Sequence, residues 1–126
     1  MMVSDKRRIL IVEDEEIRNV YGQVLVDGGF EVDMAVDGEE GLAKALEGGY
    51  SLILLDIKMP KVDGLEFLRR LGAEKTKERN GPVIVLTNYA DSEMATGARM
   101  LGAAGYVIKA NVDPGQFLTT IGGFLE

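Results

Sequence analysis

The chain has 126 residues, of which 46% are hydrophobic and 28% are charged. This length fits one ordinary domain, and this composition supports a buried core rather than intrinsic disorder. Asp and Glu total 21 against 14 Lys and Arg, so the net charge of -7 disfavours direct binding to nucleic acid or to an anionic membrane surface. The sequence has no Cys and no His, which excludes disulfides, thiolate nucleophiles, Ser-His-Asp triads and most transition-metal sites.

No apolar stretch of the sequence is long enough for a signal-peptide core or a membrane-spanning helix. The basic residues Lys6–Arg8 precede only four apolar residues, 9–12, before a run of acidic ones. The other aliphatic runs, at residues 52–55 and 83–86, are equally short. We therefore expect a cytoplasmic protein that does not enter a membrane.

Five short segments have the pattern of β-strands. Residues 8–12, 51–55 and 82–86 are continuously apolar after their first residue, which is typical of parallel strands that are buried on both faces. Residues 30–35 alternate between apolar and polar, and the apolar segment at residues 105–108 is short. These two segments are expected to form the edges of the sheet.

Amphipathic segments with a helical period separate these strands. The clearest of them places Ile17, Val20, Tyr21, Val24 and Leu25 on one face and ends before a pair of glycines. This pattern predicts a surface helix with one buried face.

Capping residues mark the starts of the other helices. Asp37 and Asp63 each have Glu three residues later, Asp113 is followed by Pro at the first helical position, and Asp91 is expected to cap the helix that lies between these last two. In the last helix, the glycines at 122–123 each cost roughly 0.8–1 kcal/mol relative to alanine. We expect that helix to end or fray there.

Strands that alternate with helices predict repeated right-handed βαβ units, and hence a doubly wound, three-layer α/β domain. For a parallel sheet of five strands with five helices, the natural strand order is the flavodoxin-like order 2-1-3-4-5. We expect one domain that spans residues 1–126.

Polar residues follow four of the predicted strands, at the edge where an open parallel sheet binds its ligands. They are Glu13 and Asp14, then Asp56, then Thr87, then Lys109. Any one of these residues alone would be interpreted as a polar residue at the end of a buried strand or as a helix cap. Three carboxylates in one crevice, however, repel one another unless a cation or Lys109 offsets their charge. An oxygen-only set with few carboxylates favours Mg²⁺.

A magnesium ion beside a carboxylate, with an amine and a hydroxyl facing it, suits phosphoryl transfer. Asp56 is the best candidate for the nucleophile, because it follows the central strand. Neither G-x-x-x-x-G-K-[ST] nor G-x-G-x-x-G occurs, so no nucleotide site is predicted. The phosphoryl group would then come from a partner or from a small donor.

Three sets of motifs carry a resemblance to a known family. They are ILIVEDE at residues 9–15, LLDIKMP at residues 54–60 followed by Asp63-Gly64, and Thr87 with Gly102-Ala103, Gly105-Tyr106 and Lys109. In order and spacing they resemble the receiver domain of two-component response regulators, in a single-domain, chemotaxis-regulator-like form. The resemblance covers nearly the whole chain.

The resemblance implies that Asp56 accepts a phosphoryl group from a histidine kinase or a phosphotransfer protein. It implies that Mg²⁺ is coordinated by Asp14, by Asp56 and by the backbone carbonyl of Lys58, while Glu13 acts through water. Lys109 would pair with one phosphoryl oxygen.

The resemblance also implies a switch. Thr87 would bind another phosphoryl oxygen, and Tyr106 would turn from exposed toward buried. This change would remodel the surface of the fourth helix, fifth strand and fifth helix, where a downstream protein target would bind. The implied function is a phosphorylation-activated signalling switch of a phosphorelay rather than an enzyme, because the protein would phosphorylate and dephosphorylate only itself. We expect a monomer or a weak dimer.

Some residues near the expected site depart from the family's usual pattern. Ala110 stands where a proline usually follows the lysine, and Asn88 is bulkier than the usual small residue after the threonine. Lys58, Asn88 and Tyr89 are therefore candidate modulators of the phosphoryl lifetime. If Asn88 and Tyr89 cover the site, the phosphoryl-aspartate would be shielded and long-lived.

Three other functions compete with this interpretation. A flavin-binding protein of the same fold is disfavoured, because the acidic residues 13–16 would repel a phosphate. A phosphatase of the haloacid dehalogenase type needs a second aspartate two residues beyond the nucleophile, where Lys58 stands. The alternative that stays open is a phosphate-independent, receiver-like scaffold or adaptor.

Overall fold

The computed structural model describes residues 7–59, 62–73, 80–88, 93–109 and 113–125. Within these ranges, strands and helices alternate along the chain, as the sequence predicts. The strands are β1 (Arg8–Val12), β2 (Glu31–Ala35), β3 (Leu52–Asp56), β4 (Val83–Thr87) and β5 (Gly105–Ile108). The helices are α1 (Ile17–Asp27), α2 (Gly38–Glu47), α3 (Gly64–Ala73), α4 (Glu93–Met100) and α5 (Pro114–Phe124).

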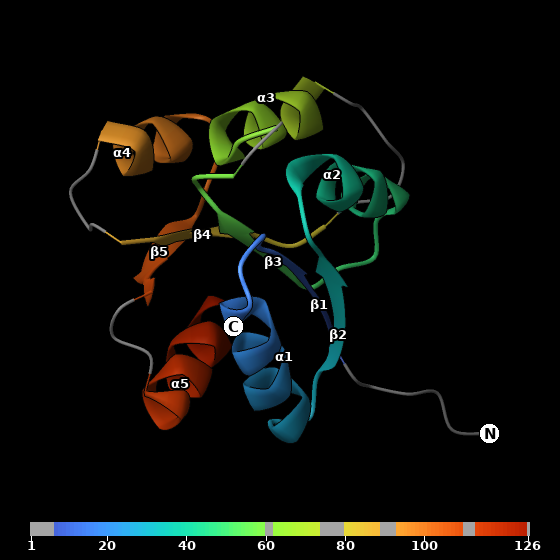
Figure 1. Cartoon of the computed structure of the whole chain (residues 1–126), viewed down its shortest axis with the longest axis vertical. Helices are drawn as coiled ribbons and strands as arrows, with labels where there is room; N and C mark the ends of the chain where they lie inside the picture. The colour runs from blue at the N-terminus through green and yellow to red at the C-terminus, as the bar shows by residue number, and fades with distance from the viewer. Residues whose placement is uncertain (1–6, 60–61, 74–79, 89–92, 110–112, 126) are drawn as a thin grey trace.

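The strands form one parallel sheet in the order β2-β1-β3-β4-β5, which confirms the predicted topology and the two predicted edges. Figure 1 shows α1 and α5 side by side on one face of the sheet and α2, α3 and α4 on the other face. The chain therefore leaves β1 over one face and reaches β3 over the opposite face. Such a reversal opens a crevice beyond the carboxyl ends of the two strands.

The core consists of two apolar layers, one on each face of the sheet. Successive side chains of a strand point to opposite faces, so each central strand contributes to both layers. The layer under α1 and α5 contains Ile9, Ile11, Leu52, Leu54, Ile84 and Leu86. The layer under α2, α3 and α4 contains Leu10, Val12, Ile53, Leu55, Val83 and Val85. This double burial explains why the central strands are continuously apolar.

Strands β3 and β4 each end one residue later than the apolar pattern predicts. The predicted strands stop before Asp56 and Thr87, whereas in the sheet Asp56 pairs with Leu86. Thr87 pairs in the same way with Ile108. The starts of β2, β3 and β4 also lie one residue later than predicted. Asp56 and Thr87 are therefore the last residues of rigid strands rather than the first residues of loops.

The predicted helix caps agree with the structure where it describes them. The side chains of Asp37, Asp63 and Asp113 each accept a hydrogen bond from the backbone N–H three residues later, at 2.8, 2.9 and 3.2 Å. These bonds satisfy donors that have no partner inside the helix. The predicted cap Asp91 lies outside the described residues.

Two predictions about helices were wrong. Val20 was placed on the buried face of α1, but it is 52% exposed, because the face that meets the sheet is centred on Tyr21 and Leu25. Helix α5 does not end at the glycines 122–123 but continues to Phe124, one residue beyond them, whereas the alternative of fraying there stays a prediction. The ring of Phe124 packs so closely on Gly105 that a Cβ there would lie 2.8 Å from it. This packing outweighs the low helix propensity of glycine.

A hydrogen-bonded cluster ties β1 and β2 to the segment before β3. The carboxylate of Asp33 accepts hydrogen bonds from the Tyr50 hydroxyl at 2.7 Å and from the Arg8 guanidinium at 2.8 Å. The same guanidinium lies 4.7 Å from the centre of the Tyr50 ring. The hydrogen bond from Tyr50 lowers the pKa of Asp33, burial opposes this effect, and Arg8 reinforces it.

We expect Gly38→Ala to destabilise the fold by about 1–3 kcal/mol, because a Cβ at this position would lie 2.1 Å from the carbonyl oxygen of Val62, which is backbone and cannot rotate away. The matched control is Gly122→Ala, whose Cβ would meet nothing within 4 Å in a helical backbone. This control should stabilise the fold by about 0.4–1 kcal/mol. Urea unfolding of the three proteins measures both effects, and equal effects of the two substitutions would contradict the close packing at Gly38.

We expect the Asp33 cluster to make stability depend on pH in the acid range. Because folding lowers the pKa of Asp33 below its ordinary 3.8, its contribution is present above that value and is lost as the pH falls through the folded pKa. Asp33→Asn should therefore lower the free energy of unfolding at pH 7 and weaken its dependence on pH below about 4. Urea unfolding over this pH range tests the expectation, and an unchanged pH dependence would contradict it.

Candidate functional site

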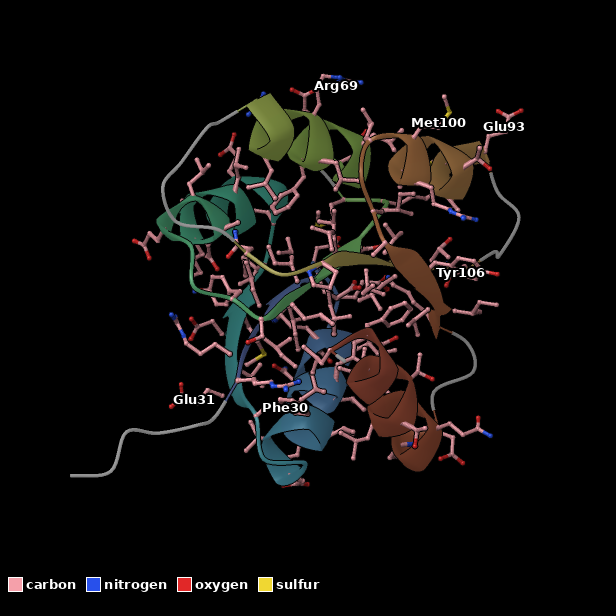
Figure 2. All side chains as sticks on the ribbon, turned by 180° about the vertical axis from the view of Figure 1, so that it is seen from behind. Phe30, Glu31, Arg69, Glu93, Met100 and Tyr106 are labelled. Atoms are coloured by element: carbon pink, nitrogen blue, oxygen red, sulfur yellow. The ribbon has the colours of Figure 1, made fainter. Side chains whose placement is uncertain are left out.

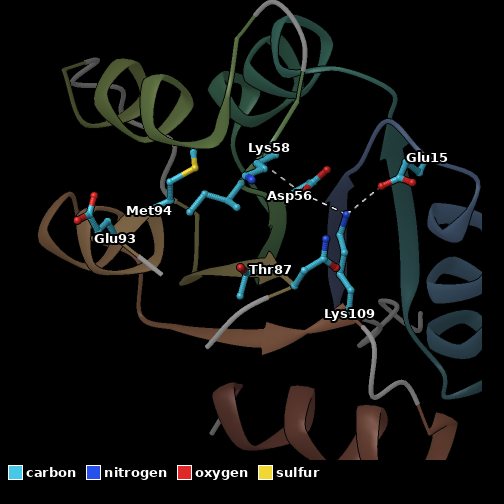
Figure 3. Close-up of a pocket in the computed structure, with 9 residues that line it drawn as sticks. Glu15, Asp56, Lys58, Thr87, Glu93, Met94 and Lys109 are labelled. Atoms are coloured by element: carbon cyan, nitrogen blue, oxygen red, sulfur yellow. Dashed lines mark hydrogen bonds and ion pairs between the residues drawn. The ribbon is translucent and has the colours of Figure 1, made fainter. Parts of the chain in front are cut away.

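A cavity of about 390 Å³ opens at the carboxyl edge of the sheet. Figure 3 shows side chains from the ends of β3, β4 and β5 converging on it. Asp56 and Thr87 form part of its wall, and Lys109 reaches into it from the residue after β5. Lys58 and Asn88 also line it. The predicted convergence of strand ends is therefore present.

The ammonium group of Lys109 is the centre of this site. Its Nζ atom lies 2.9 Å from Oε2 of Glu13 and 3.2 Å from Oδ1 of Asp56. It also lies 3.4 Å from Oε1 of Glu15. Lys109, Glu13 and Asp56 are buried, so these ion pairs have little competition from water. One cation thus joins the ends of β1, β3 and β5.

Backbone contacts hold the acidic side chains in place. The N–H of Glu13 donates to the carbonyl of Ala35 at 3.0 Å, which extends the sheet by one bond beyond β1. The guanidinium of Arg18 donates to the carbonyl of Glu13 at 2.8 Å. Oδ1 of Asp56 accepts from the N–H of Lys58 at 3.2 Å. The turns after β1 and β3 therefore preorganise the two buried carboxylates.

The pKa values reflect the crowding of charge. Burial and then the charge of Glu13 raise the pKa of Asp56, Lys109 opposes both effects, and the resulting pKa is about 7. Burial by itself lowers the pKa of Lys109, but its contacts with Glu13 and Asp56 leave that pKa above its ordinary value. Lys109 thus stays charged, while burial and Glu13 disfavour the charged form of Asp56 more than Lys109 favours it.

The acidic residues at this edge form a cluster that could hold a metal ion. Glu13, Asp14, Glu15 and Asp56 each offer a carboxylate oxygen, and these atoms all lie within 4.8 Å of one another. Oδ2 of Asp56 is buried and has no hydrogen-bond partner among the described residues. Four carboxylates beside one ammonium leave an excess of negative charge. The donor set therefore fits a hard divalent cation, which prefers oxygen ligands.

Tyr106 lies apart from the cavity. Figure 2 shows its side chain projecting from the edge strand β5 into solvent, and it is 38% exposed. Leu101 and Met100, which are 37% and 83% exposed, lie at the end of α4. Two further residues named from the sequence, Tyr89 and Ala110, lie outside the described residues.

Glu15 is one of the residues at this site whose role the sequence does not predict. Its carboxylate pairs with Lys109 although its side chain is 68% exposed. The available signal was the run of acids after β1, in which Glu15 is the third. Glu93 and Met94 also line the cavity, at the start of α4. Their place depends on how α4 approaches the sheet, which periodicity alone does not reveal.

None of the helices in the described ranges combines the length and the apolar character that crossing a membrane requires.

Comparison with known proteins identifies relatives of the chain. The model of the response regulator receiver domain matches residues 9–121. The uncharacterized transcriptional regulatory protein YkoG of Bacillus subtilis is 45% identical over 106 residues, which cover 83% of this chain and 45% of that protein. The chemotaxis protein CheY of Treponema pallidum is 35% identical over 106 residues, which cover 81% of this chain and 72% of that protein.

A solved structure agrees with these relatives. The receiver domain of a sensor histidine kinase from Pseudomonas aeruginosa, which has a magnesium ion coordinated in its active-site cleft, matches with a TM-score of 0.83 at 25% identity. The match covers 95% of this chain and 98% of that one. The chain spans about half the length of YkoG, so the match to that protein concerns one part of it. By its sequence motifs and its fold, the chain belongs to the family of response regulator receiver domains, whose members are phosphorylation-activated switches of two-component signalling.

Proposed function

We propose that this chain is a Mg²⁺-dependent phosphoryl acceptor and that Asp56 is the residue phosphorylated. The observation that carries the proposal is the buried contact of the Lys109 ammonium with the carboxylates of Glu13 and Asp56 at the cavity wall. The donor would be a histidine kinase or a phosphotransfer protein, which are the partners of receiver domains. The family function does not favour the alternative of a phosphate-independent scaffold.

The carboxylate of Asp56 supplies the nucleophile. One of its oxygens forms a bond to phosphorus while the bond from phosphorus to the donor's nitrogen breaks, and the product is an acyl phosphate. Oδ2 is the candidate oxygen, because Oδ1 already contacts Lys109 and the N–H of Lys58. The Lys109 ammonium neutralises charge that develops on the transferred group.

The acidic cluster supplies the proposed metal ligands. Asp14, Asp56 and the backbone carbonyl of Lys58 would hold Mg²⁺, with Glu13 acting through water. When bound, the ion neutralises phosphoryl oxygens and offsets the excess of carboxylate charge. The magnesium ion in the cleft of the Pseudomonas aeruginosa receiver domain supports this assignment.

The added phosphoryl charge of about -1.5 to -2 drives the switch. The Thr87 hydroxyl, at the end of β4 on the cavity wall, donates to a phosphoryl oxygen in the active arrangement. Tyr106 then turns inward from its exposed position and changes the surface of α4, β5 and α5, where a downstream protein binds. These contacts exist only in the phosphorylated arrangement, so phosphorylation shifts the population toward it. Lys58 and Asn88 line the same cavity and modulate the lifetime of the phosphoryl group, as does Tyr89.

Intact-protein mass spectrometry after incubation with Mg²⁺ and acetyl phosphate should show the gain of one phosphoryl mass. The gain should disappear in Asp56→Asn, which keeps the shape of the side chain but removes the nucleophilic carboxylate. It should also disappear with EDTA, which removes the metal.

The control for donor preference is beryllofluoride, which mimics the phosphoryl group without a donor. A folded wild-type protein that neither gains the phosphoryl mass nor binds beryllofluoride in the presence of Mg²⁺ would contradict the proposal and favour a phosphate-independent scaffold.

Lys109→Met should lower the free energy of unfolding by roughly 3 kcal/mol without Mg²⁺, because it leaves buried carboxylates without their cation. Mg²⁺ should restore part of this loss. The matched control is Lys58→Met, which removes an exposed lysine from the same cavity wall and should change stability little. Urea unfolding with and without Mg²⁺ measures both variants. Equal losses in the two variants would contradict the central place of Lys109.

A further inference from the structure

A tyrosine beneath the site has a polar atom with no partner. Tyr21 is completely buried, and its hydroxyl has no hydrogen-bond partner among the described residues. A buried hydroxyl without a partner destabilises a fold, because it has lost its hydrogen bonds to water. Native structures contain few such groups, and each one calls for an explanation.

Tyr21 lies in the first half of α1, near the end of the sheet that carries the acidic cluster. The ring stacks on Phe117 of α5, with the ring centres 5.0 Å apart and the planes at 25°. Helix α1 begins at Ile17, close to the carboxyl end of β1, and Tyr21 follows one turn later. Helical side chains incline toward the N-terminus of their helix, which in α1 is the end that adjoins the site, so this position favours a hydroxyl that faces the acidic cluster.

The charges around Tyr21 are those of the site. Burial is the largest cause that raises the pKa of Tyr21; Lys109 opposes it, Glu13, Asp56 and Glu15 reinforce it, and the resulting pKa is about 12. The hydroxyl therefore keeps its proton at neutral pH and can donate a hydrogen bond. Its candidate acceptors are carboxylates, because an ammonium group accepts none.

In the unphosphorylated protein, Lys109 pairs with the carboxylate of Glu13. Its Nζ lies within 3.1 Å of both oxygens of Glu13, at 2.9 and 3.1 Å. A phosphoryl group on Asp56 would draw the ammonium toward its own oxygens, because it carries more negative charge than a carboxylate. Oε1 of the buried Glu13 would keep its hydrogen bond from the N–H of Glu15, at 3.3 Å, so Oε2 is the oxygen that would lose its nearest donor.

We propose that Tyr21 is a positioning residue for the phosphorylated state, in which its hydroxyl donates to the carboxylate of Glu13 as Lys109 turns to the phosphoryl group. This inference rests on the proposed function. At rest the hydroxyl has no partner in the described part of the chain, and it gains one on phosphorylation, so it biases the two-state equilibrium toward the active arrangement.

Tyr50 supplies the matched control within the same chain. Its hydroxyl is also on a buried tyrosine, but it already donates to Asp33 at 2.7 Å. Tyr50→Phe therefore removes a satisfied hydroxyl away from the cavity, whereas Tyr21→Phe removes one without a partner. Both substitutions keep the ring and its packing.

The test is thermal unfolding and beryllofluoride titration of the wild type, Tyr21→Phe and Tyr50→Phe in Mg²⁺. Tyr21→Phe should melt at or above the wild-type temperature without beryllofluoride, and should bind beryllofluoride roughly tenfold more weakly, as expected for one hydrogen bond to a charged group. Tyr50→Phe should melt lower and bind beryllofluoride as the wild type does.

A spectroscopic readout separates the hydrogen bond from a general effect on packing. In protein labelled with ¹³C at the tyrosine Cζ, the signal that is absent from Tyr21→Phe identifies Tyr21. This signal should move when beryllofluoride is added to the wild type, because the Cζ shift responds to hydrogen bonding of the attached hydroxyl. The Tyr50 signal should stay in place.

Three outcomes would contradict the proposed role of Tyr21. Equal beryllofluoride affinity in Tyr21→Phe and the wild type would overturn the role of Tyr21 alone. A sharp fall in the melting temperature of Tyr21→Phe without beryllofluoride would overturn it too, because the hydroxyl would then have a partner at rest. No beryllofluoride response in the wild type would overturn both this inference and the proposed function.

Discussion

The site depends on one buried cation. Lys109 places its ammonium between Glu13 and Asp56, and the three groups come from the ends of β5, β1 and β3. Without that cation, two buried carboxylates would repel each other where solvent cannot screen them. The order of the strands is what brings the lysine there, since a residue 96 positions away in sequence completes the charge pair. Sheet topology and site chemistry are therefore linked through this contact.

The same contact makes the site responsive to added charge. Lys109 balances only part of the negative charge, because four carboxylates gather beside one ammonium, and burial together with Glu13 raises the pKa of Asp56. A divalent cation reduces the excess and a phosphoryl group increases it, so the partners of the ammonium depend on what the cavity holds. A fully neutralised cluster would be more stable, but it would gain less free energy by rearranging when charge is added. Incomplete neutralisation thus suits a switch better than a purely structural ion pair.

Much of the fold follows from the sequence because its signals are local. The continuous apolar runs predict double burial, and Asp37, Asp63 and Asp113 cap their helices as their spacing indicates. The convergence of Glu13, Asp56 and Lys109 also follows, because carboxyl ends of parallel strands share one edge. Local signals fail where tertiary contacts decide. Phe124 holds α5 together by packing on Gly105, a contact that helix propensity does not contain.

For the same reason, the sequence alone does not reveal the contact of Glu15 with Lys109 or the proposed role of Tyr21. An acidic residue at a helix start and a tyrosine on an apolar stripe both have ordinary structural interpretations, and in Tyr21 the ring does pack in the core against Phe117. What distinguishes Tyr21 is its hydroxyl oxygen, whose hydrogen bonding depends on the charged groups at the ends of β1, β3 and β5. A leucine would fill an apolar layer without an unsatisfied hydroxyl. The hydroxyl therefore destabilises the unphosphorylated state. This is an argument that it stabilises another state of the protein.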